Sequence, residues 1–169
     1  HYGFLQPFSQ VLGWHMYNEP WFLGEKRAAM FKTYSQLRNR LMPYIYTMAH
    51  VASRTALPIM RALPLAYPED RNCDNYLHQY LLGEAFLVSA FDDIVYLPQG
   101  EWLDYWTGQV HTGGREIPAQ FPADRGGPLF VKAGAIIPTQ PVRNALGTQS
   151  PEEIIWEIFP HGKSEFTLL

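Results

Sequence analysis

An aromatic and polar stretch near the start of the chain has the residue types of a ligand pocket. Gly3 to Trp21 reads GFLQPFSQVLGWHMYNEPW and contains two Trp, two Phe, one Tyr, one His and three side-chain amides. This stretch is too aromatic for a linker and too polar for a buried strand. Aromatic rings pack against C–H-rich surfaces, and amides both donate and accept hydrogen bonds. We therefore predict that this stretch forms part of a pocket wall.

The other reactive side chains form no recognisable cluster along the sequence. The six His show neither HxH nor HExxH spacing, and Cys73, the only Cys, cannot build a thiolate site or an internal disulfide. Asp92 and Asp93 fall in a predicted turn, and Glu69 and Asp70 fall in a Pro-rich loop. Acids in such places are expected to be solvated turn residues. We predict no metal and no cofactor.

The composition indicates a globular protein without a polyanionic or membrane partner. The 169 residues are 47% hydrophobic and 17% charged, with a net charge of -3. No polybasic run favours nucleic acid, and no apolar run approaches the ~20 residues of a membrane span. We also expect a piece of a longer protein. A patterned segment begins directly at His1, and the last residues, SEFTLL, stop within a strand-like pattern.

The first region, residues 1–57, predicts a short strand, a loop and a long helix. Tyr2 to Phe8 is strand-like, and an amphipathic helical pattern follows it. Pro43 lies inside that pattern and predicts a kink or a break, because proline lacks the backbone donor of a helix interior. The periodic apolar positions are Met30, Tyr34, Leu37, Leu41, Ile45, Met48 and Ala52.

The rest of the chain is predicted to be β structure. Short apolar runs separated by Gly and Pro indicate a sandwich or barrel in residues 58–139. Residues 140–169 predict a polar linker and a hairpin in which 154–159 pairs with 164–169. The expected strands of the middle region are 85–90, 94–98, 101–108 and a pair within 127–138.

Four sequence blocks, in this order, resemble glycoside hydrolase family 31, the retaining α-glucosidases and α-xylosidases. The blocks are LRNRLMPYIYT, PIMRALPL, YLPQGEWLDYWTG and PLFVKAGAIIP. The resemblance implies an α+β fragment: the last βα unit of a (β/α)₈ barrel in 1–57, followed by an all-β sandwich in 58–139. Residues 140–169 would then lead to a further β element. In such barrels the loops after the strands form the catalytic face.

The resemblance also implies a reaction whose catalytic residues are missing here. Retaining glycosidases need two carboxyls ~5–5.5 Å apart, one as nucleophile and one as acid/base. The family's two Asp motifs do not occur in this chain, so we assign it no catalytic residue and expect the isolated segment to be inactive. Its expected partners are an oligosaccharide or α-glycoside substrate and the rest of the catalytic barrel.

Substrate-binding candidates come from the opening stretch. Family members commonly have an Arg and then a His here, and aligning Gly3 and Pro7 puts Gln10 and Leu12 at these two positions. Because both depart from the pattern, a sugar contact is also assigned to Trp14 or His15. Packing within the loop explains Trp14 equally well, and an ordinary loop histidine explains His15 better.

Other prominent residues have a structural explanation. We expect Trp102, Tyr105 and Trp106 to pack between layers rather than to bind glycans. Arg61 is expected to brace the contact between sandwich and barrel, because a buried Arg needs acceptors.

Two alternatives remain open. The chain is also compatible with a non-catalytic carbohydrate-binding β-sandwich, or with an interaction module that uses the apolar helix face. A single small sandwich is not expected to cover that face, so the isolated chain would expose it and bind a hydrophobic dye.

Overall fold

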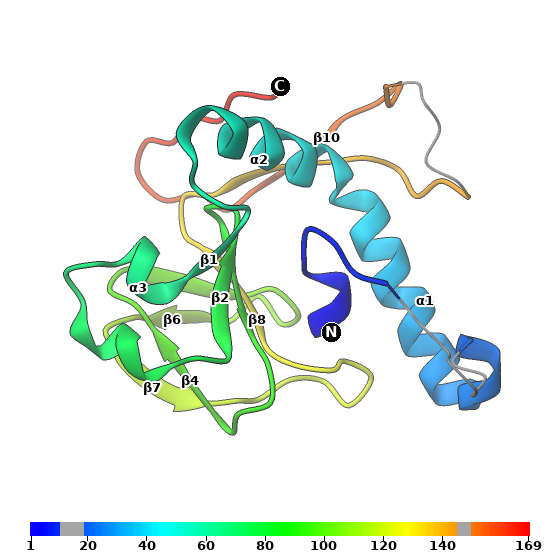
Figure 1. Ribbon diagram of the computed structural model, residues 1–169, viewed down its shortest axis with the longest axis horizontal. Coiled ribbons are helices and arrows are strands. Elements are labelled where there is room, and N and C mark those ends of the chain that lie inside the picture. Colours follow the sequence, from blue (N-terminus) through cyan, green and yellow to red (C-terminus); the bar gives the residue numbers. More distant parts are fainter. Residues whose placement is uncertain (11–18, 145–149) are drawn as a thin grey trace.

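The chain folds into a helical layer packed on a sheet. The computed structural model describes residues 1–10, 19–144 and 150–169. In Figure 1 the helix α2 (Met42–Thr55) lies across the top of the strands and α1 (Glu25–Arg40) runs down at the right, with the N-terminal segment between α1 and the sheet. Because this segment is sandwiched between the two layers, its position depends on both.

The predicted long helix is present as two helices, α1 (Glu25–Arg40) and α2 (Met42–Thr55). They are separated at Leu41, two residues before Pro43, as proline in the first turn of a new helix allows. The break expected from Pro43 is therefore confirmed. Shorter helical elements are η1 (Tyr2–Phe4), η2 (Pro20–Leu23), α3 (Leu63–Ala66) and η3 (Arg71–Asn75).

The described strands form one large sheet and two ribbons. The large sheet has six strands in the order β1-β2-β3-β8-β5-β6, while β9 pairs with β10 and β4 pairs with β7, all antiparallel. The strands are β1 (Met60–Ala62), β2 (Gln79–Leu82), β3 (Phe86–Ser89), β4 (Ile94–Leu97), β5 (Glu101–Asp104), β6 (Val110–Thr112), β7 (Arg115–Pro118), β8 (Leu129–Lys132), β9 (Ile136–Thr139) and β10 (Ile155–Ile158).

Both faces of the large sheet are covered at β2, β3 and β8, where alternate residues supply the two cores. On β3, Phe86 and Val88 join the cluster that packs against α1 and α2, whereas Leu87 joins the cluster under the β4–β7 ribbon. Each core therefore depends on the strand register. Both clusters contain fully buried large side chains, such as Tyr34, Tyr44 and Phe86 in the first and Trp102 in the second.

The apolar helix face is covered, contrary to expectation. Tyr34, Leu37, Leu41, Ile45 and Met48 are all buried in the first core. The sheet covers part of this helix face. The segment around Leu5 covers another part, which the helical pattern does not reveal. The dye binding expected of the isolated chain is therefore no longer predicted.

Two local predictions are wrong. Tyr2–Phe4 forms a 3₁₀ helix instead of a strand, because the amides of Phe4 and Leu5 bond back to the carbonyl of His1. The second is the expected hairpin: residues 164–169 form no strand, and β10 pairs with β9. The local sequence pattern could not identify this partner, because residues 140–154 separate β9 from β10 along the chain.

Candidate functional site

Three of the four predicted substrate contacts lie outside the described residues. These are Leu12, Trp14 and His15. Gln10, the fourth, lies at the end of the described N-terminal segment and is exposed. The described backbone next to Gln10 is the segment of residues 4–7 that precedes it.

That backbone is held by side chains from other elements. Arg38, in the last turn of α1, donates from Nη1 to the carbonyls of Phe4 (2.9 Å) and Gln6, and from Nη2 to the carbonyl of Pro7 (2.9 Å). Tyr80 of β2 donates its hydroxyl to the carbonyl of Leu5 at 2.9 Å, and burial raises the pKa of this tyrosine. Four successive carbonyls, 4 to 7, thus each accept a side-chain hydrogen bond.

Several acids of the described residues make structural contacts. Asp104 is buried, and its Oδ1 accepts hydrogen bonds from the amides of Trp106 (2.8 Å) and Thr107 (3.0 Å), which closes the turn after β5. Asp92 contacts His78 Nδ1 at 2.9 Å. These roles require a carboxylate that accepts hydrogen bonds or balances charge, not one that attacks or protonates a substrate.

Asp70 likewise serves the fold. Its carboxylate accepts hydrogen bonds from the hydroxyl of Tyr96 (2.6 Å) and from the backbone amide of Asn72 (3.1 Å). The Tyr96 hydrogen bond is the main cause that lowers the pKa of Asp70 below its ordinary value. The residue ties η3 to β4, as a turn acid is expected to do.

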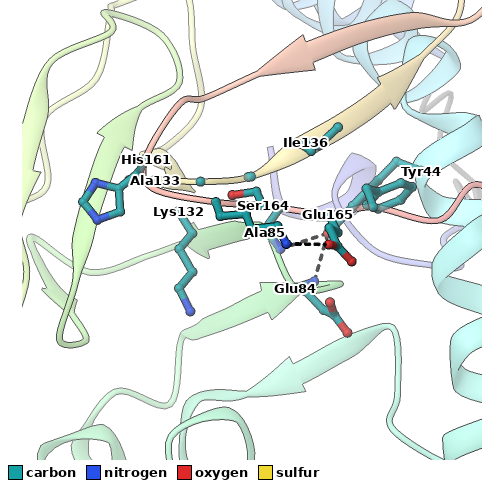
Figure 2. A pocket seen from close by; sticks show the side chains of 13 residues that line it. Tyr44, Glu84, Ala85, Lys132, Ala133, Ile136, His161, Ser164 and Glu165 are labelled. Carbon is teal, nitrogen blue, oxygen red and sulfur yellow. Dashed lines mark hydrogen bonds and ion pairs between the residues drawn. The ribbon is translucent and has the colours of Figure 1, made fainter.

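A cavity of about 430 Å³ lies where the C-terminal segment passes the β8–β9 turn. Figure 2 shows that Glu84 and Glu165 both line it, together with Lys132 and Tyr44. Both carboxylates are exposed, and each contacts a cation: Glu84 lies 3.5 Å from Arg61, and Glu165 lies 3.4 Å from Lys163. Exposed, ion-paired carboxylates lack the apolar setting that a general acid requires.

The buried wall of this cavity is a structural joint. The Tyr44 hydroxyl donates to the carbonyl of Leu82 (3.0 Å) and accepts from the amides of Glu84 (2.9 Å) and Ala85 (3.0 Å), as the dashed lines in Figure 2 indicate for the last two. Burial raises the pKa of Tyr44 to about 12, so its proton stays in place to donate. The joint fixes α2 to the β2–β3 turn.

The aromatic residues of the third sequence block pack as expected. Trp102 is fully buried and donates its indole N–H to the carbonyl of Pro98 at 2.8 Å. Tyr105 and Trp106 are half-buried against the helix-side core.

Arg61 is buried and donates to the carbonyl of Pro58 at 2.9 Å. Since its partners Pro58 and Glu84 both lie in the 58–139 region, these contacts brace that region internally.

The described ranges contain neither a metal-binding cluster nor a membrane-spanning helix. No group of three or more His, Cys, Asp or Glu residues in 1–10, 19–144 and 150–169 is arranged to hold a metal ion. Over the same ranges, no helix has both the length and the apolar character of a membrane span.

Two family models match the chain, one after the other. The model of the glycosyl hydrolases family 31 TIM-barrel domain matches residues 1–48, and that of the family's C-terminal domain matches residues 56–137. The chain belongs to glycosyl hydrolase family 31. The order of the two matches agrees with the order of the sequence blocks that carry the resemblance.

Named relatives within family 31 are longer proteins. The chain is 35% identical over 162 residues to a 1,6-alpha-glucosyltransferase of Sporosarcina globispora, which is 90% of this chain and 13% of that protein. It is 34% identical to an alpha-xylosidase of Saccharolobus solfataricus, over 78% of this chain and 19% of that protein. The chain thus spans less than a fifth of these relatives.

Solved structures of family 31 share the fold. A Flavobacterium johnsoniae dextranase complexed with glucose is similar with a TM-score of 0.79 and 35% identity, over 85% of this chain and 18% of that one. The cycloalternan-forming enzyme of Listeria monocytogenes gives a TM-score of 0.80 and 32% identity, over 95% of this chain and 17% of that one. The agreement extends across both the helical layer and the sheet.

The residues that sequence reasoning missed are Arg38 and Tyr80. Arg38 lies within the LRNRLMPYIYT block of the family resemblance, but outside the periodic apolar positions of the helix. A buried Tyr hydroxyl in a strand likewise needs a partner. Neither signal names the acceptors, which lie more than 30 residues away in the chain.

Proposed function

We propose that these residues are the C-terminal end of the catalytic barrel and the adjoining β-domain of a retaining α-glycosidase. The observation that carries the proposal is one core shared by the two segments that match the family models. Leu5, Tyr34 and Tyr44 from the barrel-matching segment pack in one cluster with Phe86 and Val131 from the other. Such a shared core would let the β-domain stabilise the end of the catalytic barrel.

The proposed domain division follows the change from a helical to a β sequence pattern along the chain. Residues 1–57 would supply the last loop and helix of the barrel, with α1 and α2 as a broken barrel helix. Residues 58–139 would be a sandwich, for which the β4–β7 ribbon facing the large sheet across the second core is the support. Residues 140–169 would lead to a further β element.

The reaction needs carboxylates from elsewhere in the protein. A retaining mechanism uses one carboxylate as nucleophile and a second as acid/base, ~5–5.5 Å apart. The acids described above close turns or pair with cations, so the proposal assigns both catalytic roles to residues outside this chain. In this proposal, the chain contributes Gln10, Leu12, Trp14 and His15, which precede α1 in the sequence, to the rim of the sugar pocket.

We further propose α-1,6-linked gluco-oligosaccharides as the substrate class. Relatives named for such chemistry support it: the 1,6-alpha-glucosyltransferase and an isomaltosyltransferase of Sporosarcina globispora, and a dextranase variant complexed with isomaltotriose. The replacement of the usual Arg and His by Gln10 and Leu12 also fits a pocket that differs from that of common α-glucosidases.

The test is turnover by the full-length protein. Isomaltotriose, maltotriose and an aryl α-xyloside would be compared, and the anomer first released would be followed by proton NMR. The proposal expects the highest kcat/KM with isomaltotriose and an α-configured first product. Preference for maltotriose or the xyloside would refute the substrate class, and a β-configured product would refute the retaining mechanism.

A further inference from the structure

We propose that Arg38 is the positioning residue of the segment that leads to Gln10, an inference that rests on the proposed function. Its guanidinium reaches the carbonyls of Phe4, Gln6 and Pro7 at once. Gln10 follows Pro7 by three residues, a reach of at most ~11 Å along the backbone. Fixing Pro7 therefore limits where Gln10 can lie.

The chemistry of this contact suits arginine and no other side chain. Guanidinium presents several N–H donors in a rigid planar fork, whereas lysine offers a single point charge on a flexible stem. Hydrogen bonds from a charged donor are stronger than neutral ones. Arg38 directs two nitrogens at three carbonyl oxygens, and partial burial lowers its pKa while leaving arginine charged.

The segment depends on this contact because it belongs to no sheet. Residues 5–10 contribute to no described helix or strand, so no ladder of backbone hydrogen bonds fixes them. The carbonyl of Leu5 is bound by Tyr80, and those of the flanking residues are bound by Arg38. Tyr80 secures the buried Leu5, and Arg38 secures the exposed part that leads to the loop.

The neighbouring Arg40 provides a matched control. It lies in the same turn of α1, and its guanidinium pairs with Glu157 of β10, away from residues 4–7. Removing either cation takes one charge from the end of the same helix. Only Arg38→Gln removes the hold on the carbonyls before Gln10.

The experiment measures isomaltotriose turnover by the full-length protein in the wild type, Arg38→Gln, Arg38→Lys and Arg40→Gln. Small displacements of substrate-positioning groups cost large factors, so KM should rise about tenfold in Arg38→Gln while kcat falls less than threefold. Arg38→Lys should give a KM between that variant and the wild type. Arg40→Gln should lower Tm without changing KM.

Hydrogen–deuterium exchange of residues 4–10 separates this proposal from the function it rests on. Faster exchange in Arg38→Gln, but not in Arg40→Gln, supports the positioning role even if the wild type turns over no glycoside. A wild-type KM and wild-type exchange in Arg38→Gln would overturn the proposal. An equal KM change in Arg40→Gln would overturn it too, and if Arg38→Gln does not fold, the lysine variant decides.

Discussion

The two halves of the molecule are held together in different ways. In residues 56–139 most strands pair with partners nearby in sequence, such as β2 with β3 and β5 with β6. In residues 1–55, α1 and α2 are stabilised by hydrogen bonds between residues close in sequence. The segment before them is held by side chains that lie more than 30 residues away in the sequence. The N-terminal segment is therefore fixed from both halves, by Arg38 of α1 and by Tyr80 of β2.

The two halves meet at a few specific contacts. Tyr44 of α2 bonds the β2–β3 turn through Leu82, Glu84 and Ala85. At the other end, the Tyr34 hydroxyl accepts the amide of Gly126 at 3.1 Å. Changing one such contact should weaken the joint, and changing a contact within the β-half should not.

The largest effect is expected from Gly83→Ala, which strikes the joint directly. Gly83 has φ +65°, and an added Cβ would overlap the Tyr44 hydroxyl and lie 2.7 Å from Met48 Cγ. Left-handed backbone strain and overpacking together should reduce the unfolding free energy by roughly 3 kcal/mol. Urea unfolding of residues 1–169 measures this change.

Gly108→Ala is the matched control within the β-half. Gly108 has φ +75°, but nothing lies within 4 Å of an added Cβ. Backbone strain alone should cost about 1 kcal/mol. Equal losses in the two variants would mean that the joint with α2 adds nothing.

Tyr44→Phe should have the next largest effect. It leaves the ring in the core and removes the hydroxyl, so the buried amide of Ala85 and the partly buried amide of Glu84 lose their acceptor. Unsatisfied buried donors should reduce the unfolding free energy by about 2 kcal/mol. Tyr46→Phe, at a side chain that is 57% exposed, should change it by less than ~0.5 kcal/mol. Matching losses would contradict the special role of Tyr44.

The smallest effect is a pH dependence confined to the β-half. The hydrogen bond from Tyr96 lowers the pKa of Asp70 below 3.8, so the folded state favours the carboxylate. This stabilisation is present above 3.8 and disappears as the pH falls through the lower, folded-state pKa. Tyr96→Phe should make the unfolding free energy fall less steeply between pH 5 and pH 3, as acid titrations followed by circular dichroism would show. An unchanged slope would contradict this.

Much of the fold could be predicted because it depends on local pattern. The spacing of Tyr34, Leu37 and Leu41 marks a helix, and Pro43 marks its break. The apolar run containing Phe86 and Val88 marks a buried strand. These signals concern neighbours within a few residues, and the structure agrees with them.

The wrong secondary-structure predictions occur where residues far away in the sequence determine the local conformation. Tyr2–Phe4 alternates like a strand but has no strand beside it, and its neighbours bond to Arg38 and Tyr80 instead. The β10 partner is β9, which no turn motif connects to it. For the candidate site, sequence reasoning proposes Gln10 as a sugar contact but gives no sign of the Arg38 guanidinium that holds the backbone leading to it.

The most direct test of the account compares isomaltotriose turnover by the full-length protein and by residues 1–169 alone. The account predicts activity in the full-length protein and none in the isolated, folded segment, because the catalytic carboxylates lie outside it. Turnover by the isolated segment that disappears in Glu84→Gln or Asp92→Asn would contradict it.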